Sequence, residues 1–183
     1  YSLMVTNSGG GYSQWKGIEI TRWRSDPCLD SGGVLCYLRE TDRDLLWSNT
    51  FHPAGGKIET YNASFALDRA VIRRMDDGIE TMTEIAVSPE DDVEIRRLTL
   101  INRSHRTRRI ELTSCIELSM ALHGADLQHS AFNKLFIQTE AIPDRRTLIA
   151  WRRQRRADEQ NVFVGHRFSS DRPIESADAF SFE

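Results

Sequence analysis

The residues best suited to chemistry lie together near the start of the chain, in the stretch Asn7–Asp30. Its three consecutive glycines, residues 9–11, allow backbone angles closed to other residues, so the chain can turn sharply or approach a ligand closely. Tyr12 and Trp23 offer flat apolar faces with polar edges, which suit a sugar ring or a partner surface. Arg22 adds planar, multi-donor hydrogen bonding. The stretch therefore suits binding, although a hairpin turn followed by core tryptophans is the simpler alternative.

The same glycines do not fit a nucleotide site. GGGYSQW lacks the Lys-Ser/Thr ending of a phosphate-binding loop, and no helical pattern follows it. The spacing of the glycines also fails the dinucleotide-binding fingerprint. We therefore exclude nucleotide binding.

No catalytic group is selected by the sequence. Glycoside hydrolysis needs two carboxylates that flank the scissile bond, and no spacing favours one pair among the many carboxylates. The nucleophile signature GxSxG is absent. His129 has an unusual setting in QHSAF, but an isolated histidine is more typical of a structural role. The residues alone indicate a binding or structural module without catalytic residues. The carboxylates considered are Asp26, Asp30, Glu84, Glu117 and Glu140.

Composition indicates a globular protein. Of the 183 residues, 39% are hydrophobic and 28% are charged, and the net charge of −3 argues against a nucleic acid or an anionic membrane as partner. No apolar run approaches the roughly 18 residues of a membrane span, and no signal peptide opens the chain. The one local charge excess is the basic run Trp151–Arg156. Such a run is usually a solvated strand end, and contact with an anionic partner is the alternative.

The cysteines and histidines do not predict a metal or a cofactor. Cys28, Cys36 and Cys115 form no CxxC pair, and the five histidines have no recognisable zinc spacing. We predict reduced and mostly buried thiols. A disulfide between Cys28 and Cys36 is the lesser alternative.

Alternation of apolar and polar residues with period two dominates the chain and predicts β-strands bounded by turns. Asp76–Gly78 is a strong hairpin signal. The apolar residues of 93–100 change parity at Arg96 and Arg97, which predicts a β-bulge there. Residues 126–131 suit a loop or a short helical turn. The fold class is therefore all-β, an antiparallel β-sandwich in a single domain, residues 1–183. Strands are predicted at 1–5, 18–22, 34–38, 45–47, 61–71, 79–87, 93–100, 110–118, 132–139, 147–152 and 161–168.

Ordered blocks along nearly the whole chain resemble a known family. They are VTNSGGGYSQW, ITRWRSD, LLWSNTFHP, VSPEDDVEIRRLTLINRS, IELTSCIEL and HSAFNKLFIQTE. Together they resemble the β-sandwich region that precedes the catalytic barrel in glycoside hydrolase family 94, the cellobiose-phosphorylase-like enzymes. The corresponding region of cyclic β-1,2-glucan synthetases is especially similar.

This resemblance implies an antiparallel β super-sandwich similar to galactose-mutarotase-like folds. It implies a parent that is a glycosyltransferase or glycoside phosphorylase, whose catalytic aspartate sits in a separate α/α barrel. The implied partners are a β-linked glucan, that barrel and a second copy in a homodimer, with no nucleic acid and no membrane insertion by this region. The implied location is the cytoplasmic face, within an inner-membrane protein. The family's sandwich is usually longer, so the domain is expected to continue beyond Phe180–Glu183.

If the chain contacts glucan, we expect the opening stretch to carry the contact. The glycines would allow close approach, the aromatic rings would stack, and Arg22 would bind hydroxyls or phosphate. The rivals are a structural or dimerisation module with no sugar affinity and, at lower weight, an independent mutarotase-like or lyase-like enzyme. The expected contact residues are Gly10, Gly11, Tyr12, Ser13, Arg22 and Trp23, with His129, Phe132 and Asn133 as a second group.

Overall fold

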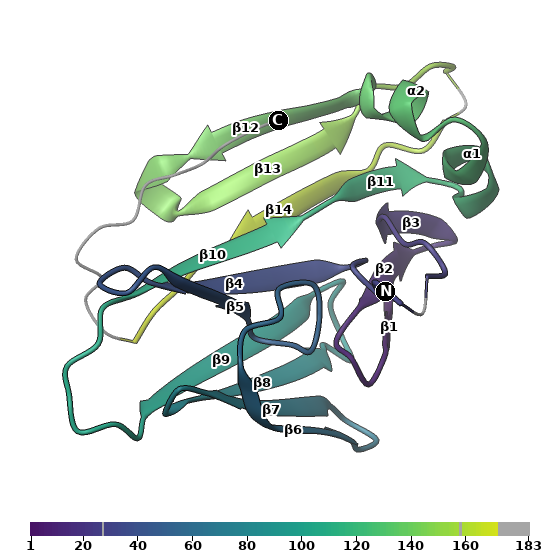
Figure 1. Ribbon diagram of the computed structural model, residues 1–183. Coiled ribbons are helices and arrows are strands. Elements are labelled where there is room, and N and C mark those ends of the chain that lie inside the picture. Colours follow the sequence, from purple (N-terminus) through teal and green to yellow (C-terminus); the bar gives the residue numbers. More distant parts are fainter. Residues whose placement is uncertain (27, 158, 172–183) are drawn as a thin grey trace. The chain divides into compact units, whose positions relative to one another are not determined.

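A computed structural model describes residues 1–26, 28–157 and 159–171 (Figure 1). The described chain forms two compact units, one from Tyr1 to Glu117 and one that begins at Leu118. The residues expected to lead into a longer domain, Phe180–Glu183, lie outside the described part.

Antiparallel strands are the main secondary structure of both units, which confirms the all-β prediction. The strands of the first unit are β1 (Ser2–Val5), β2 (Gly11–Trp15), β3 (Ile18–Thr21), β4 (Val34–Glu40), β5 (Leu45–Ser48), β6 (Ile58–Phe65), β7 (Ala70–Asp76), β8 (Ile79–Val87), β9 (Glu94–Asn102) and β10 (Ile110–Ile116). The elements of the second unit are β11 (Leu118–Ala121), α1 (His123–Gln128), α2 (Ser130–Lys134), β12 (Ile137–Ile142), the 3-10 turn η1 (Pro143–Arg145), β13 (Thr147–Arg152) and β14 (Phe163–Arg167).

Within the first unit the strands form three groups. β1, β2 and β3 pair in order, β4 pairs with both β5 and β10, and β6 to β9 form a four-stranded meander. Figure 1 shows the β10-β4-β5 sheet as one layer and the meander as another. In the second unit β12, β13 and β14 form an antiparallel sheet, while α1 and α2 contact each other and β11.

The hairpin between β7 and β8 has the predicted turn. Asp76 pairs with Ile79, and the two residues between them have positive φ, 46° at Asp77 and 76° at Gly78. Both central residues of a type I′ turn need positive φ, which Asp tolerates and Gly adopts at no cost. The turn sets the register of β8, whose residues from Ile79 to Ile85 alternate between buried and half-buried.

Two clusters of buried side chains form the core of the first unit. Leu38, Trp47 and Ile79 are at most 3% exposed and join β4 and β5 to the start of β8. Ala70, Ile72 and Ile85 form the second cluster, against which β1 and β6 place partly buried side chains. Burial of these faces drives the strands together.

The predicted β-bulge in β9 is wrong. Strand β9 pairs with β8 without interruption from Val87 and Glu94 to Ile79 and Asn102. The apolar pattern misleads because Ile95 points outward and is 58% exposed. Glu94 and Arg96, which form an ion pair, point to the inner face of the strand instead. The register shift of the meander lies between Ile58 and Thr60 instead.

The predicted strand at 132–139 is wrong in its first half. Residues 130–134 form α2, and β12 begins only at Ile137. Phe132 lies in α2 and Phe136 lies two residues beyond its end, and their ring centroids are 5.2 Å apart. The apolar run was compatible with both structures over so short a length.

The prediction of mostly buried thiols is also wrong, although the thiols are free as expected. Cys28 and Cys115 are exposed and Cys36 is half-buried. Cys28 therefore forms no disulfide with Cys36. Cys115 lies on β10, where alternate side chains point to opposite faces.

Candidate functional site

The glycines of the opening stretch are buried against the chain's own atoms. A Cβ added at Gly10 would lie 2.3 Å from Oδ1 of Asp30, and one added at Gly11 would lie 1.9 Å from the carbonyl oxygen of Met4. Asp30 is held above the loop because its Oδ2 accepts hydrogen bonds from the hydroxyls of Thr6 and Ser8. The close approach that these glycines permit is therefore filled by protein.

Tyr12 and Trp23 form a partly accessible pair of rings in this stretch. Their ring centroids are 5.5 Å apart with planes tilted by 45°, and both side chains are half-buried. The edge of Trp23 rests on Gly32, where an added Cβ would lie 2.8 Å from Cδ1 of the indole. The ring pair is thus held in place and keeps part of its surface in solvent, as stacking on a ligand requires.

Ser13 belongs to a buried network around Glu94. Its hydroxyl donates to Oε2 of Glu94 at 2.6 Å, and the hydroxyl of Tyr1 donates to the same oxygen at 3.0 Å. Arg96 donates from Nε to Oε1. Burial alone would raise the pKa of Glu94, but the charge of Arg96 and these hydrogen bonds outweigh it and hold that pKa below its usual range.

Arg22 forms an ion pair with Glu117, the residue that follows β10. Its side chain is 6% exposed, and Nη1 lies 2.6 Å from Oε1 of Glu117. The backbone N–H of Arg22 also donates to the carbonyl of Glu117 at 2.7 Å. Arg22 therefore orders the strand that precedes Trp23, and it is not presented to solvent.

The second predicted group lies in the other unit, around α1 and α2. His129 joins the two helices and is exposed, and Phe132 is 46% exposed. Asn133 is 3% exposed; its Nδ2 donates to Asp126 at 3.1 Å and its Oδ1 accepts from Nη2 of Arg152 at 3.2 Å. Asn133 thus ties α1 and α2 to β13. The prediction that either group contacts glucan stays a prediction.

An aromatic–arginine cluster was missed by sequence reasoning. It consists of Phe132, Phe136, Arg152, Arg153 and Arg155, with guanidinium carbons 5.0–5.5 Å from the ring centroids. The basic run and the HSAFNKLF block were each recognisable in the sequence, but nothing local predicted that one stacks on the other. Cation–π contact of this kind favours arginine over aromatic faces.

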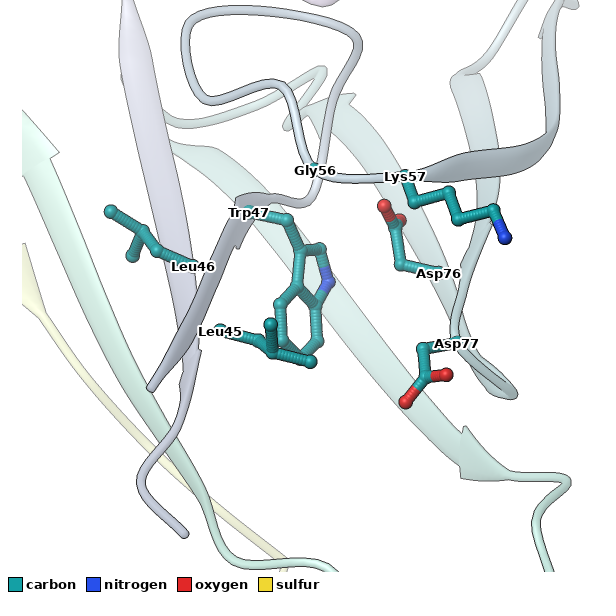
Figure 2. A pocket seen from close by; sticks show the side chains of 7 residues that line it. All are labelled: Leu45, Leu46, Trp47, Gly56, Lys57, Asp76 and Asp77. Carbon is teal, nitrogen blue, oxygen red and sulfur yellow. The ribbon is translucent and has the colours of Figure 1, made fainter. Parts of the chain in front are cut away.

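A small cavity at the β7–β8 turn was also missed (Figure 2). It measures about 80 Å³, well below the roughly 300–1,000 Å³ of ligand pockets and enough for a few water molecules. Nε1 of Trp47 is buried there without a hydrogen-bond partner among the described residues, whereas Asp76 is engaged by Arg74. The lining residues are Leu45, Leu46, Trp47, Gly56, Lys57, Asp76 and Asp77.

Three carboxylates of the first unit are paired with arginines. Glu40, 2% exposed, accepts from Nε of Arg108 at 2.6 Å, and Asp76 accepts from Nε of Arg74 at 2.6 Å. Hydrogen bonding from Arg97 holds the pKa of Glu84 below its usual range. A general acid in glycoside cleavage needs the opposite shift. The lowered pKa of Glu84 therefore does not fit that role.

Two further carboxylates considered from the sequence lie in different units. Glu117 contacts Arg22 in the first unit, and Glu140 is exposed on β12 of the second. The described residues contain no group of three His, Cys, Asp or Glu side chains arranged to hold a metal ion. Nor do they contain a helix long and apolar enough to cross a membrane.

Comparison with known proteins gives a family across almost the whole chain. Residues 1–180 match the family described as "Glycosyl hydrolase 94, supersandwich domain". The chain is 33% identical over 91% of its length to the cyclic beta-(1,2)-glucan synthase NdvB of Rhizobium meliloti, of which the match covers 6%.

Two phosphorylases are more distant relatives. The chain is 23% identical over 82% of its length to solabiose phosphorylase of Paenibacillus borealis and 25% identical over 70% to N,N'-diacetylchitobiose phosphorylase of Vibrio proteolyticus. The matched region is 17% of each of these proteins. The chain therefore corresponds to a small part of the curated relatives it matches.

Proposed function

Because the chain belongs to glycoside hydrolase family 94 as its supersandwich domain, we propose that it is a non-catalytic, carbohydrate-associated module of a cyclic β-1,2-glucan synthetase-like enzyme. In this proposal it helps to form or cover the glucan site of a catalytic barrel. The parent would be a transferase or phosphorylase, and this module would lie on its cytoplasmic side.

The half-exposed Tyr12–Trp23 pair is the observation that carries the sugar role. It is the part of the opening stretch whose aromatic surface is held by the fold and still reaches solvent. The named activities of the relatives concern a glucan and two disaccharides, which are ligands that stack on such faces. The lowered pKa values of Glu84 and Glu94 support the non-catalytic part of the proposal, since a general acid needs a raised pKa.

A structural or dimerisation module without sugar affinity is the second candidate. The observation in its favour is the internal use of the opening stretch: Gly10, Gly11, Ser13 and Arg22 are all buried in contacts within the first unit. In that case the Tyr12–Trp23 pair would pack on another part of the parent.

Calorimetric titration of the chain with linear and cyclic β-1,2-glucans, with cellobiose for comparison, separates these candidates. The carbohydrate role predicts saturable heat that Trp23→Ala abolishes while circular dichroism keeps the wild-type spectrum. Trp15→Ala is the matched control, because the ring of Trp15 is already occupied by contacts within the chain. Its Nε1 donates to Oδ2 of Asp92 at 2.6 Å, and Nζ of Lys16 lies 4.6 Å from its ring centroid. Absence of heat at millimolar glucan would favour the structural module. Equal loss in both variants would show that the heat does not report stacking on Trp23.

A further inference from the structure

The aromatic–arginine cluster concentrates positive charge in a small volume of the second unit. The guanidinium carbons of Arg152, Arg153 and Arg155 lie 5.4, 5.5 and 5.2 Å from the ring centroid of Phe136. Arg155 also lies 5.0 Å from the centroid of Phe132. All three charges therefore fall within 5.5 Å of one ring centre, although like charges repel at such distances.

Among the described residues, no carboxylate lies within salt-bridge distance of Arg152, Arg153 or Arg155. Glu159 and Asp126 act on Arg152 only from a longer distance, and both carboxylates accept hydrogen bonds from other groups. Asp126 accepts from the amide of Asn133 at 3.1 Å, and Glu159 accepts from the backbone N–H of Arg155 at 2.8 Å. The cluster thus differs from the arginines of the first unit, where Arg74, Arg96 and Arg108 each contact a carboxylate.

Hydrogen bonds within the second unit hold two of these arginines in place. Arg152 is half-buried and donates to both the carbonyl and the side-chain oxygen of Asn133. The backbone N–H of Arg153 donates to the carbonyl of Phe136 at 2.8 Å. Burial lowers the pKa of Arg152; the charges of Glu159 and Asp126 act in the opposite sense, and the charge of Arg155 lowers the pKa again. An anion placed among the three would relieve this repulsion.

We propose that the aromatic–arginine cluster is a binding site for a phosphate group. A guanidinium stacked on a ring keeps its in-plane N–H donors free at the edge, and that fork matches the oxygens of a phosphate. A phosphate carries close to two negative charges and three acceptor oxygens at neutral pH. Three guanidiniums around one ring supply more donors and charge than a neutral sugar hydroxyl would use. The proposal does not depend on glucan binding by the first unit.

The phosphate group can belong to a free small molecule or to a lipid headgroup, and separate probes distinguish these sources. Inorganic phosphate and glucose 1-phosphate, titrated by calorimetry at constant ionic strength, test free ligands. Vesicles of phosphatidylcholine with and without phosphatidate, tested by co-sedimentation, test a membrane surface. Saturable binding to either small molecule, or binding to phosphatidate vesicles alone, identifies the source of the phosphate.

The decisive variant is Arg153→Gln combined with Arg155→Gln, because both side chains are exposed and their replacement leaves the core intact. We expect its affinity for the phosphate probe to fall about tenfold or more, the scale of one lost charge-assisted bond. The matched control is Arg145→Gln with Arg146→Gln. It removes the same charge from exposed residues at the opposite end of the β12–β13 hairpin, where Ile142 pairs with Thr147, and its affinity should stay within about twofold.

Phe136→Leu separately tests the role of the aromatic ring on which the arginines stack. It keeps apolar bulk but removes the ring on which the arginines stack, so it should weaken phosphate binding while the total charge is unchanged. The proposal is overturned if neither phosphate compounds nor phosphatidate vesicles bind. It is equally overturned if the two arginine double variants lose affinity to the same extent, because binding would then follow net charge alone.

Discussion

The guanidinium of Arg74 and the carboxylate of Asp76 form a two-point ion pair inside the first unit, with Nε to Oδ2 at 2.6 Å and Nη2 to Oδ1 at 2.9 Å. The residues are two apart on β7 and therefore share one face of the strand. Arg74 also donates to backbone carbonyls of Thr50, Ala54 and Gly55. One buried cation thereby joins the meander to residues 50–55, the loop that leads to Gly56 at the small cavity.

Asp76→Asn should destabilise the chain severely. The substitution leaves Arg74, whose side chain is 0% exposed, with a buried charge that no carboxylate balances. Removing one partner of a buried pair costs about 3–5 kcal/mol. Urea denaturation followed by tryptophan fluorescence measures the free energy of unfolding. Asp44→Asn is the control, since the Arg39–Asp44 pair is exposed on both sides and exposed ion pairs contribute little to stability. Similar losses in the two variants would contradict the structural role assigned to Arg74.

Gly10→Ala should lower stability even when no ligand is present. Its Cβ would lie 2.3 Å from Oδ1 and 2.5 Å from the backbone oxygen of Asp30, and overpacking of this kind costs about 1–3 kcal/mol. Gly55→Ala is the matched control, because a Cβ there meets nothing within 4 Å. The midpoint of thermal unfolding compares the two. An unchanged midpoint for Gly10→Ala would mean that the space above Gly10 is open to a ligand after all.

Local chemistry made part of this fold predictable. The Asp77–Gly78 turn and the alternation along β8 are encoded within a few residues, and both were found as expected. The inward ion pair of Glu94 and Arg96 was not predictable, because its stability depends on Tyr1 and Ser13, more than 80 residues away. When those partners are unknown, charged residues on the inner face of β9 are mistaken for outward-facing residues, and the apolar pattern then predicts a bulge.

The same limit applies to the candidate site. The types of Gly10, Tyr12 and Trp23 marked the opening stretch as unusual, but nothing local to these residues predicted that Asp30 would pack over the glycines. Likewise, Phe132 and Arg155 are 23 positions apart, and only the fold of the second unit stacks one on the other. Residue type predicts what a side chain can do, whereas long-range packing decides what it contacts.

Glu94 should stabilise the chain at neutral pH and lose this effect in acid. Its folded-state pKa is lowered, while the unfolded value is about 4.3. The stabilisation is therefore fully present above the unfolded pKa and disappears as the pH falls through the lower folded pKa. We expect the difference in unfolding free energy between wild type and Glu94→Gln to be largest above about pH 5 and to shrink towards pH 3. Urea titrations at pH 7, 5, 4 and 3 measure this difference.

Glu90→Gln serves as the control for the acid experiment, since Glu90 is exposed in the turn before β9. Its difference from wild type should stay small at every pH. A Glu94→Gln difference that is constant from pH 7 to pH 3 would show that the carboxylate gains nothing from Arg96, Ser13 and Tyr1 in the folded chain.

The three thiols should react with iodoacetamide in a fixed order at pH 8. Burial raises the pKa of Cys36 to about 11, so only about one thiol in a thousand is the reactive thiolate. Burial and the charge of Glu117 also raise the pKa of Cys115, although that residue is exposed. Cys28 is exposed at the opening stretch. Peptide mapping by mass spectrometry should find Cys28 modified first and Cys36 last. Cys28→Ser should remove the fast phase, and early modification of Cys36 would mean that β4 is less protected than its pairing with β10 implies.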